Sequence, residues 1–391
     1  PKFDSTAPRA DEQSPFMAAP TAEMISEECR SFAGQRVAVA LSGGVDSAVA
    51  ARRLQQAGAE VIGLSLRLHD PDPDNPLAPR ACCPPEDLQD ARRVAEALDV
   101  PFYVIDARDA FDGAVVKPFV SSYLAGRTPN PCVGCNSFVK LDRLARRAAA
   151  LGCVRLATGH YARLWRASPE GPAHLFRGLD AEKDQSYFLF GTDTRILDRL
   201  LFPLGASTKD EVRTEALASG MPVAHKLESQ EVCFVGGAGA GRFVMRQPQA
   251  QGDHSGPIVD EQGRTLGQHD GVMNFTIGQR RGIGVAARTK LHVLSIDAED
   301  KTITVGPASS LGKSGLVARN PAWPAGAPEG PIEATVKIRY RDPGTPAVVT
   351  PTADGVEVRF ERPVRAVAPG QAAVFYAGDE VIGGAWIEAA R

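Results

Sequence analysis

Hydrophobic and polar residues alternate in blocks along the first part of the chain. A continuous apolar run at 36–41 predicts a buried strand, and the segment 47–56 predicts a helix that ends at Gly58. Another apolar run at 61–66 predicts a second strand. Strands that alternate with helices are typical of a parallel sheet covered by helices on both faces.

This alternation continues to about residue 160. A helical repeat of apolar residues is followed by a predicted strand at 102–105, and the stretch 155–160 predicts a further strand that ends in a loop at Gly159-His160. The apolar positions of that helix are Leu88, Ala91, Val94, Ala95 and Leu98. Ligands of open parallel sheets bind at the carboxyl ends of the strands. We therefore expect the loop after the first strand and Gly159-His160 to lie near each other.

Beyond about residue 240 the pattern changes to short strands separated by glycine-rich turns. Apolar and polar residues alternate at 334–340 and 356–360, and further β-like runs lie at 372–376 and 381–387. Short strands at this spacing indicate a small antiparallel barrel.

The loop Leu41-Ser-Gly-Gly-Val-Asp-Ser47 joins the first strand to the first helix. Its two glycines let backbone N–H groups approach an anion, and the helix presents its positive end. Ser42 and Ser47 can donate hydroxyl hydrogen bonds, and Asp46 can hold Mg²⁺. The loop lacks the Lys-Ser/Thr pair of P-loop kinases and GTPases. An ordinary glycine turn is the alternative, but the whole pattern resembles the ATP loop of the N-type ATP pyrophosphatases, which split ATP to AMP and pyrophosphate.

Composition narrows the possible partners and compartments. The formal net charge is -3, so RNA would have to bind to local clusters of Lys and Arg. Candidates are Lys140, Arg143, Arg146, Arg147, Arg280 and Arg281. The sequence has no run of roughly 18–20 apolar residues that would cross a bilayer, and its start lacks a secretory pattern. We expect a cytoplasmic protein that has no membrane partner.

The 7 cysteines are too few, and odd in number, for a secreted disulfide scaffold. Cys132 and Cys135 lie in a Pro- and Gly-rich stretch that we expect to be a loop ahead of a helix at 137–151. A helix N-terminus lowers a thiol pKa and favours the nucleophilic thiolate. This Cys-x-x-Cys also fits a redox pair or half of a zinc site. Cys233 lies in another loop-like segment, and the adjacent Cys82 and Cys83 are typical of packing.

Six motifs occur in order along the chain. They are the Leu41–Ser47 loop, Asn130-Pro-Cys-Val-Gly-Cys-Asn136, Thr158-Gly-His-Tyr161, Lys183-Asp-Gln-Ser-Tyr-Phe188, the Cys233 segment and Phe275-Thr-Ile-Gly-Gln-Arg-Arg-Gly282. Together they resemble the tRNA-specific 2-thiouridylases, which place sulfur on C2 of the wobble uridine. The resemblance begins near Arg36. It implies an α/β fold in which a PP-loop domain of the adenine-nucleotide α-hydrolase type precedes a small central domain and an antiparallel β-barrel.

The resemblance also implies roles for individual residues. ATP would be bound by Leu41, Ser42, Gly43, Gly44, Val45, Asp46, Ser47 and Ala48, with Leu66 and Gly159 lining the adenosine site. Cys135 would be the nucleophile and Cys233 the persulfide carrier, and the two would form a disulfide during the cycle. The target base would lie near Asn130, Pro131 and Cys132. Further tRNA contacts would come from His160, Lys183, Asp184, Gln185, Arg339, Tyr340 and Gln371.

Cys132 departs from some members of the family, which carry an Asp assigned as a base at this position. A thiol fills that role less obviously. Cys132, Cys135 and Cys233 could instead hold a [4Fe-4S] cluster with one iron open to hydrosulfide. Sulfur would come from a persulfide or sulfide donor protein. We divide the chain into a disordered N-terminal extension at 1–30, an ATP domain at 31–238, a central tRNA-binding domain at 239–316 and a barrel at 317–391.

Two other functions remain open at this stage. The chain could be another PP-loop ATP pyrophosphatase, either an amide ligase or a thiolase for a different tRNA base. It could also be a tRNA-binding protein with a vestigial nucleotide site. Pyrophosphate release that depends on unmodified tRNA would separate these readings, because a binding protein releases none and an amide ligase needs no RNA.

Overall fold

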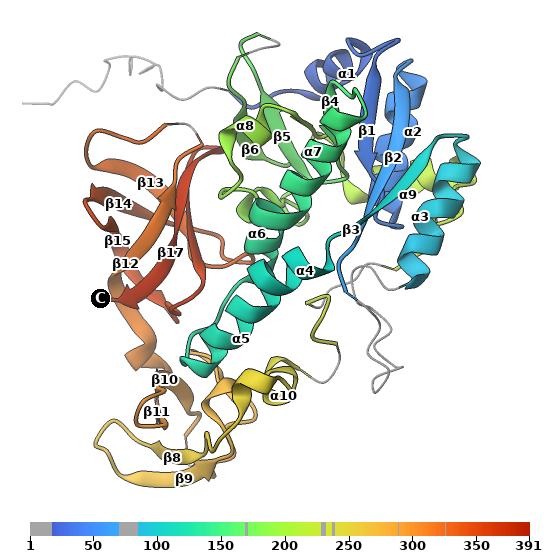
Figure 1. Ribbon diagram of the computed structural model, residues 1–391. Helices are drawn as coiled ribbons and strands as arrows, with labels where there is room; N and C mark the ends of the chain where they lie inside the picture. The colour runs from blue at the N-terminus through green and yellow to red at the C-terminus, as the bar shows by residue number, and fades with distance from the viewer. Residues whose placement is uncertain are drawn as a thin grey trace, which may run out of the picture.

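The computed structural model describes residues 18–69, 85–168, 171–227, 232–236, 239–287, 289–324 and 326–391. Cys82 and Cys83 lie outside the described residues. A helix-covered sheet, a small four-stranded sheet and a barrel make up the molecule (Figure 1). None of the described helices is both long and apolar enough to span a bilayer.

The first domain is built on a five-stranded parallel sheet in the order β3-β2-β1-β4-β7. Its strands are β1 Arg36–Ala40, β2 Glu60–Arg67, β3 Phe102–Asp106, β4 Arg155–Ala157 and β7 Leu200–Leu201. Successive β1 side chains enter different cores, as the alternation of a strand requires. Val37 and Val39 pack with helices on one face, and Ala38 packs into the cluster on the other.

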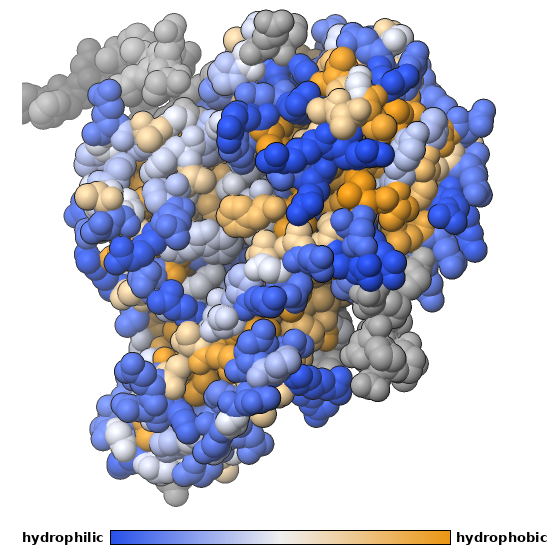
Figure 2. Space-filling model, in the orientation of Figure 1, coloured by the Kyte–Doolittle hydropathy of each residue, from blue (hydrophilic) through white to orange (hydrophobic). Residues whose placement is uncertain are grey.

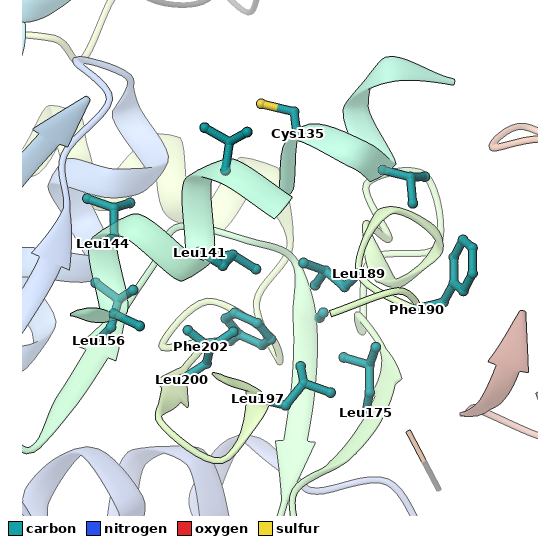
Figure 3. Packing of buried hydrophobic residues seen from close by; sticks show 14 of the residues in the cluster. Cys135, Leu141, Leu144, Leu156, Leu175, Leu189, Phe190, Leu197, Leu200 and Phe202 are labelled. Atoms are coloured by element: carbon teal, nitrogen blue, oxygen red, sulfur yellow. The ribbon is translucent and has the colours of Figure 1, made fainter. Parts of the chain in front are cut away.

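Helices cover both faces of this sheet. On the face of Val37 lie α1 Ala22–Arg30, α2 Val45–Gln56, α3 Pro85–Ala97 and α9 Lys209–Ala218. On the other face a long helical run consists of α6 Pro131–Cys135, the π-helical turn η2 Asn136–Lys140 and α7 Leu141–Ala150. A second run consists of α4 Arg108–Phe111, η1 Asp112–Val116 and α5 Lys117–Leu124. Figure 3 shows the core beneath the first run, with Cys135 at its margin.

The central domain lies next to the C-terminal end of α5 (Figure 1). Its sheet has the order β10-β11-β8-β9 and encloses a small apolar core around Ile258 and Ile303. The strands are β8 Gly256–Val259, β9 Thr265–His269, β10 His292–Asp297 and β11 Thr302–Gly306. Helix α10 Ala240–Met245 packs with α5 through Val244, Phe119 and Val120.

The third domain is a closed antiparallel barrel of six strands. Its order is β12-β15-β14-β13-β16-β17, and pairing of β12 with β17 closes it. The strands are β12 Gly312–Ala322, β13 Ile332–Lys337, β14 Thr345–Thr352, β15 Gly355–Arg365, β16 Ala372–Ala377 and β17 Glu380–Ala390. The hairpin of β5 Ala162–Trp165 and β6 His174–Arg177 joins this sheet at β17, where Glu380 pairs with Phe176. The first and third domains therefore share one hydrogen-bonded sheet.

Three local expectations were wrong. The disordered extension expected at 1–30 includes α1, because Thr21 caps the Met24 N–H and because Ile25 and Cys29 are buried. The strand expected at 334–340 ends at Lys337. It stops there because Asp342 accepts the N–H groups of Ile338 and Gly344 in a turn.

The third error concerns the cysteine motif, which we expected to be a loop. Instead Cys132 and Cys135 lie in α6, whose first residue is Pro131. Proline suits this position because its φ is already helical and it has no N–H to satisfy. Gly134 did not prevent the helix, since the run continues through η2 and α7 and gains buried side chains along its length.

Candidate active site

The predicted phosphate loop lies between the carboxyl end of β1 and the start of α2. Gly43 has a φ of +74°, and a Cβ placed there would lie 2.2 Å from the carbonyl oxygen of Asp87 in α3. Only glycine fits this position. The Ser47 hydroxyl donates to the Gly44 carbonyl at 3.0 Å and accepts the Ser42 N–H at 3.2 Å. These bonds hold the loop in a curve around the N-terminus of α2, which no side chain caps.

Asp46 in the first turn of α2 is engaged by two other elements. Its oxygens accept Lys209 Nζ of α9 at 2.6 and 2.8 Å, and Oδ1 also accepts the Tyr161 hydroxyl at 2.8 Å. The Lys209 side chain is only 8 % exposed. Gln185 in turn accepts the Tyr161 N–H at 3.0 Å. The Asp46 carboxylate thus already carries a paired ammonium, with which a metal ion at this position would compete.

Sequence analysis did not single out Lys209 or Tyr161 for this site. Thr208 and Glu211 form a capping box at the start of α9, which is a recognisable sequence signal for a helix start. That signal places Lys209 in the first turn, but the contact with Asp46 depends on how α9 packs against α2.

The structure brings the predicted adenosine residues to the same edge of the sheet. β2 and β4 flank β1, and Leu66 lies near the carboxyl end of β2. A Cβ at Gly159 would lie 2.7 Å from the Ser47 N atom, so the loop after β4 touches the start of α2. The expectation that Gly159 and the phosphate loop lie near each other is confirmed.

His160 lies beside the same edge and is half-buried. Its Nδ1 is 2.7 Å from the Thr158 hydroxyl, and its ring makes an edge contact with Phe202. Burial of the ring, with a smaller contribution from Lys140, lowers the pKa of His160 from 6.5 to about 4. The imidazole is therefore neutral near pH 7 and can offer a hydrogen bond but no positive charge.

Cys135 and Cys233 border the same apolar cluster. Cys135 is buried within it, and Cys233 and Phe234 pack against it from a segment distant in the sequence. Phe234 anchors that segment, because its ring contacts those of Phe111 and Phe119 at 5.5 and 5.0 Å. Cys132, on the same short helix as Cys135, is exposed. In the described part of the chain, no three His, Cys, Asp or Glu side chains are arranged to hold a metal ion.

Three family models match successive parts of the chain. The model described as "tRNA methyl transferase HUP domain" matches residues 35–237, "tRNA methyl transferase PRC-barrel domain" matches 243–307, and "Aminomethyltransferase beta-barrel domain" matches 313–387. The tRNA-specific 2-thiouridylase MnmA of Geotalea uraniireducens is 47% identical over 90% of this chain and 95% of its own length. Its namesake in Sorangium cellulosum is 48% identical over 92% of this chain and 94% of its own.

This chain belongs to the tRNA-specific 2-thiouridylase family. The model descriptions mention methyl transfer, whereas the relatives are named for thiolation. A solved 4-thiouridine synthetase–RNA complex with bound ATP is 16% identical and matches 56% of this chain and 47% of its own, with a TM-score of 0.33, too low to support an argument.

The residues predicted to contact tRNA lie in different settings. Asp184 is buried and accepts the N–H groups of Gly178 and Ser186, so its side chain organises a turn. Arg339 is exposed, and Tyr340 stacks 4.6 Å from Phe188. Lys183 is half-buried on the turn that Asp184 organises. Contact of these side chains with tRNA stays a prediction.

A further predicted RNA-binding region is the surface of α7, where hydrophilic side chains gather beside an apolar patch near β3 (Figure 2). Arg143, Arg146 and Arg147 are exposed there. Arg146 pairs with Asp142 at 2.9 Å, and Arg147 lies 5.8 Å from the Tyr103 ring centroid. Exposed pairs of this kind are weak enough for phosphate to replace them.

Proposed function

We propose that this chain catalyses ATP-dependent 2-thiolation of the wobble uridine of tRNA. The observation that carries the proposal is the meeting of two features in one domain. An ATP-type phosphate loop lies at the carboxyl edge of the sheet, and two cysteines distant in sequence contact one apolar cluster that reaches the sheet at β2. Activation of an oxygen and delivery of sulfur need these two features.

The first step activates the uridine. The C2 oxygen attacks the α-phosphorus of ATP, and the bond to pyrophosphate breaks. This converts a poor leaving group into AMP. Backbone N–H groups at the start of α2 and the hydroxyl of Ser42 would hold the phosphates, and the Ser47 hydroxyl, which donates to the Gly44 carbonyl, would turn to them when ATP binds.

The second step transfers sulfur. The terminal sulfur of a persulfide on Cys233 attacks C2, and AMP leaves with the electron pair of the C–O bond. Cys135 thiolate then attacks Cys233 Sγ, so the persulfide bond breaks and a Cys135–Cys233 disulfide forms while the sulfur stays on C2. A thiol reductant restores both cysteines. The Cys233 thiolate then attacks the outer sulfur of a persulfide on a donor protein, so that the donor's S–S bond breaks and the donor thiolate leaves. In the other order, Cys135 releases hydrosulfide first and that anion attacks C2.

Mg²⁺ would accompany ATP, held by Asp46 and the phosphates. Carboxylate oxygens suit Mg²⁺, and the carboxylate of Asp46 is partly exposed. The ion supplies charge neutralisation of the phosphates when it is bound. Lys209, displaced from Asp46, would remain beside the phosphates as a second cation.

The alternative with a [4Fe-4S] cluster on Cys132, Cys135 and Cys233 has less support. The described residues contain no group of three or more metal-binding side chains, and we derive no step through a cluster. Visible absorption of anaerobically purified protein, with iron and sulfide counts, measures whether one is present.

The decisive experiment is nucleoside analysis of tRNA incubated with the protein, ATP, Mg²⁺ and a persulfide sulfur donor. We expect 2-thiouridine at the wobble position. Cys135→Ser and Cys233→Ser should each abolish it while tRNA binding persists, and Cys29→Ser, a change at a buried thiol in the core of α1, is the matched control. Thiolation by either of the first two variants would overturn the two-thiol mechanism.

A further inference from the structure

The segment 126–129 is the point where the three domains of the molecule meet. The Thr128 N–H donates to the Pro369 carbonyl of the barrel at 2.8 Å, and Gln371 Nε2 donates to the Thr128 carbonyl at 2.9 Å. The Thr128 hydroxyl lies 3.4 Å from that of Thr276 in the central domain. One residue of the ATP domain is therefore tied to both of the others.

The fit around this segment is close. Gly370 has a φ of +92°, and a Cβ placed there would lie 3.1 Å from the carbonyl carbon and oxygen of Thr128. A Cβ at Gly126 would lie 2.7 Å from Ile296 of the central sheet. Arg127 also pairs with Glu388 of β17 at 3.1 Å. The segment has little room to move while the barrel and the central domain stay in place.

The segment leads directly into the helix that carries the proposed nucleophile, Cys135. Asn130 immediately precedes α6, and Cys132 and Cys135 follow on that helix. Both groups that Gln371 approaches are carbonyl oxygens, of Thr128 at 2.9 Å and of Pro129 at 3.5 Å, so its NH₂ end must face them. The amide therefore fixes the backbone immediately before α6, the helix that carries Cys132 and Cys135.

We propose that Gln371 is a positioning residue that sets the place of α6, and with it Cys135, by holding the carbonyls of Thr128 and Pro129. This proposal rests on the proposed function, because it assigns Gln371 to the chemistry of Cys135. It differs from a tRNA contact in one measurable respect. A positioning role acts on the cysteine helix in the free protein, whereas a tRNA contact acts only when RNA is bound.

Gln371→Glu tests this, because it keeps the shape of the side chain but removes the donor. In the free protein, we expect alkylation of the buried Cys135 by iodoacetamide to rise about fivefold, as expected for losing one hydrogen bond that keeps the helix closed. Peptide mass spectrometry follows the modification. Single-turnover thiolation should fall by about the same factor, while the Kd for tRNA stays within about twofold.

Gly370→Ala provides an independent second variant, because it pushes the turn away from Thr128 and leaves the Gln371 amide intact. It should raise Cys135 alkylation in the same way. Gln251→Glu, the same charge change at an exposed residue of the central domain, should leave it unchanged. Wild-type Cys135 alkylation in Gln371→Glu, with a weaker Kd for tRNA, would overturn the proposal. If the wild-type protein thiolates no tRNA, the proposed function fails while the alkylation comparison still decides the role of Gln371.

Discussion

Asp46 is the residue whose surroundings say most about how the ATP site works. Its carboxylate accepts a nearly buried ammonium, that of Lys209, and a tyrosine hydroxyl. In the proposed mechanism, Mg²⁺ bound with ATP would compete with this ammonium for the carboxylate of Asp46.

Asp46→Asn should reduce tRNA-dependent pyrophosphate release at least about a hundredfold, because a neutral amide binds Mg²⁺ poorly. Raising the Mg²⁺ concentration should recover part of the rate. Lys209→Met is the matched variant, since it removes the competing cation and should not raise the Mg²⁺ requirement. Pyrophosphate release is measured against Mg²⁺ concentration, and full activity of Asp46→Asn at wild-type Mg²⁺ would contradict the metal role.

His160 has a pKa that is lowered to about 4 by burial and, to a smaller extent, by Lys140. The unfolded chain binds this proton near pH 6.5 and the folded chain only near 4, so protonation favours unfolding between these values. The free energy of unfolding should therefore fall as pH drops from 6.5 towards 4, and this contribution is complete above 6.5. His160→Gln should make the free energy of unfolding less dependent on pH between these values. Urea titrations of both proteins at several pH values measure this free energy. Identical pH profiles would contradict the lowered pKa of His160.

At the scale of elements, the two glycines of the loop before α2 are not equivalent, because only the position of Gly43 requires glycine. Gly43→Ala should destabilise the protein by about 3 kcal/mol or more, since the new Cβ meets the backbone of α3 at a positive φ. Gly44→Ala is the control, because the nearest atom to its Cβ is the Ser42 hydroxyl oxygen at 3.5 Å, and it should cost about 1 kcal/mol or less. Urea unfolding compares them. Equal losses would mean that the contact with α3 does not decide the effect.

Sequence patterns predicted these elements well where burial repeats regularly. The strands β1 and β2, the helix α2 and the barrel strands β16 and β17 lie within a few residues of the predicted ranges. The helix of the cysteine motif was missed because its Pro and Gly are typical of loops. The π-helical turn η2 after Cys135 follows from packing rather than from a sequence pattern. The contacts of Asp46 and Gln371 were also beyond prediction, because each joins segments that only the tertiary fold brings together.

At the scale of the whole molecule, the hairpin β5–β6 connects the ATP domain to the barrel. Arg163 of β5 has a side chain only 9 % exposed and pairs with Asp379 at 2.9 Å, next to the pairing of β6 with β17. Asp379→Ala should lower the free energy of unfolding by about 1–2 kcal/mol, since Arg163 keeps only its carbonyl partners. Asp354→Ala, a change at an exposed residue of the same barrel, should cost much less. Urea unfolding of the three proteins checks this, and equal stability of all of them would contradict it.

The shared sheet also affects the order in which the protein is made. Strand β6 leaves the ribosome about 200 residues before β17, its partner, which at ordinary rates of synthesis takes about 10–40 s. Throughout that interval β6 has an unpaired edge, of the kind that draws foreign strands or chaperones. The nascent ATP domain must wait for the barrel before its own surface is complete.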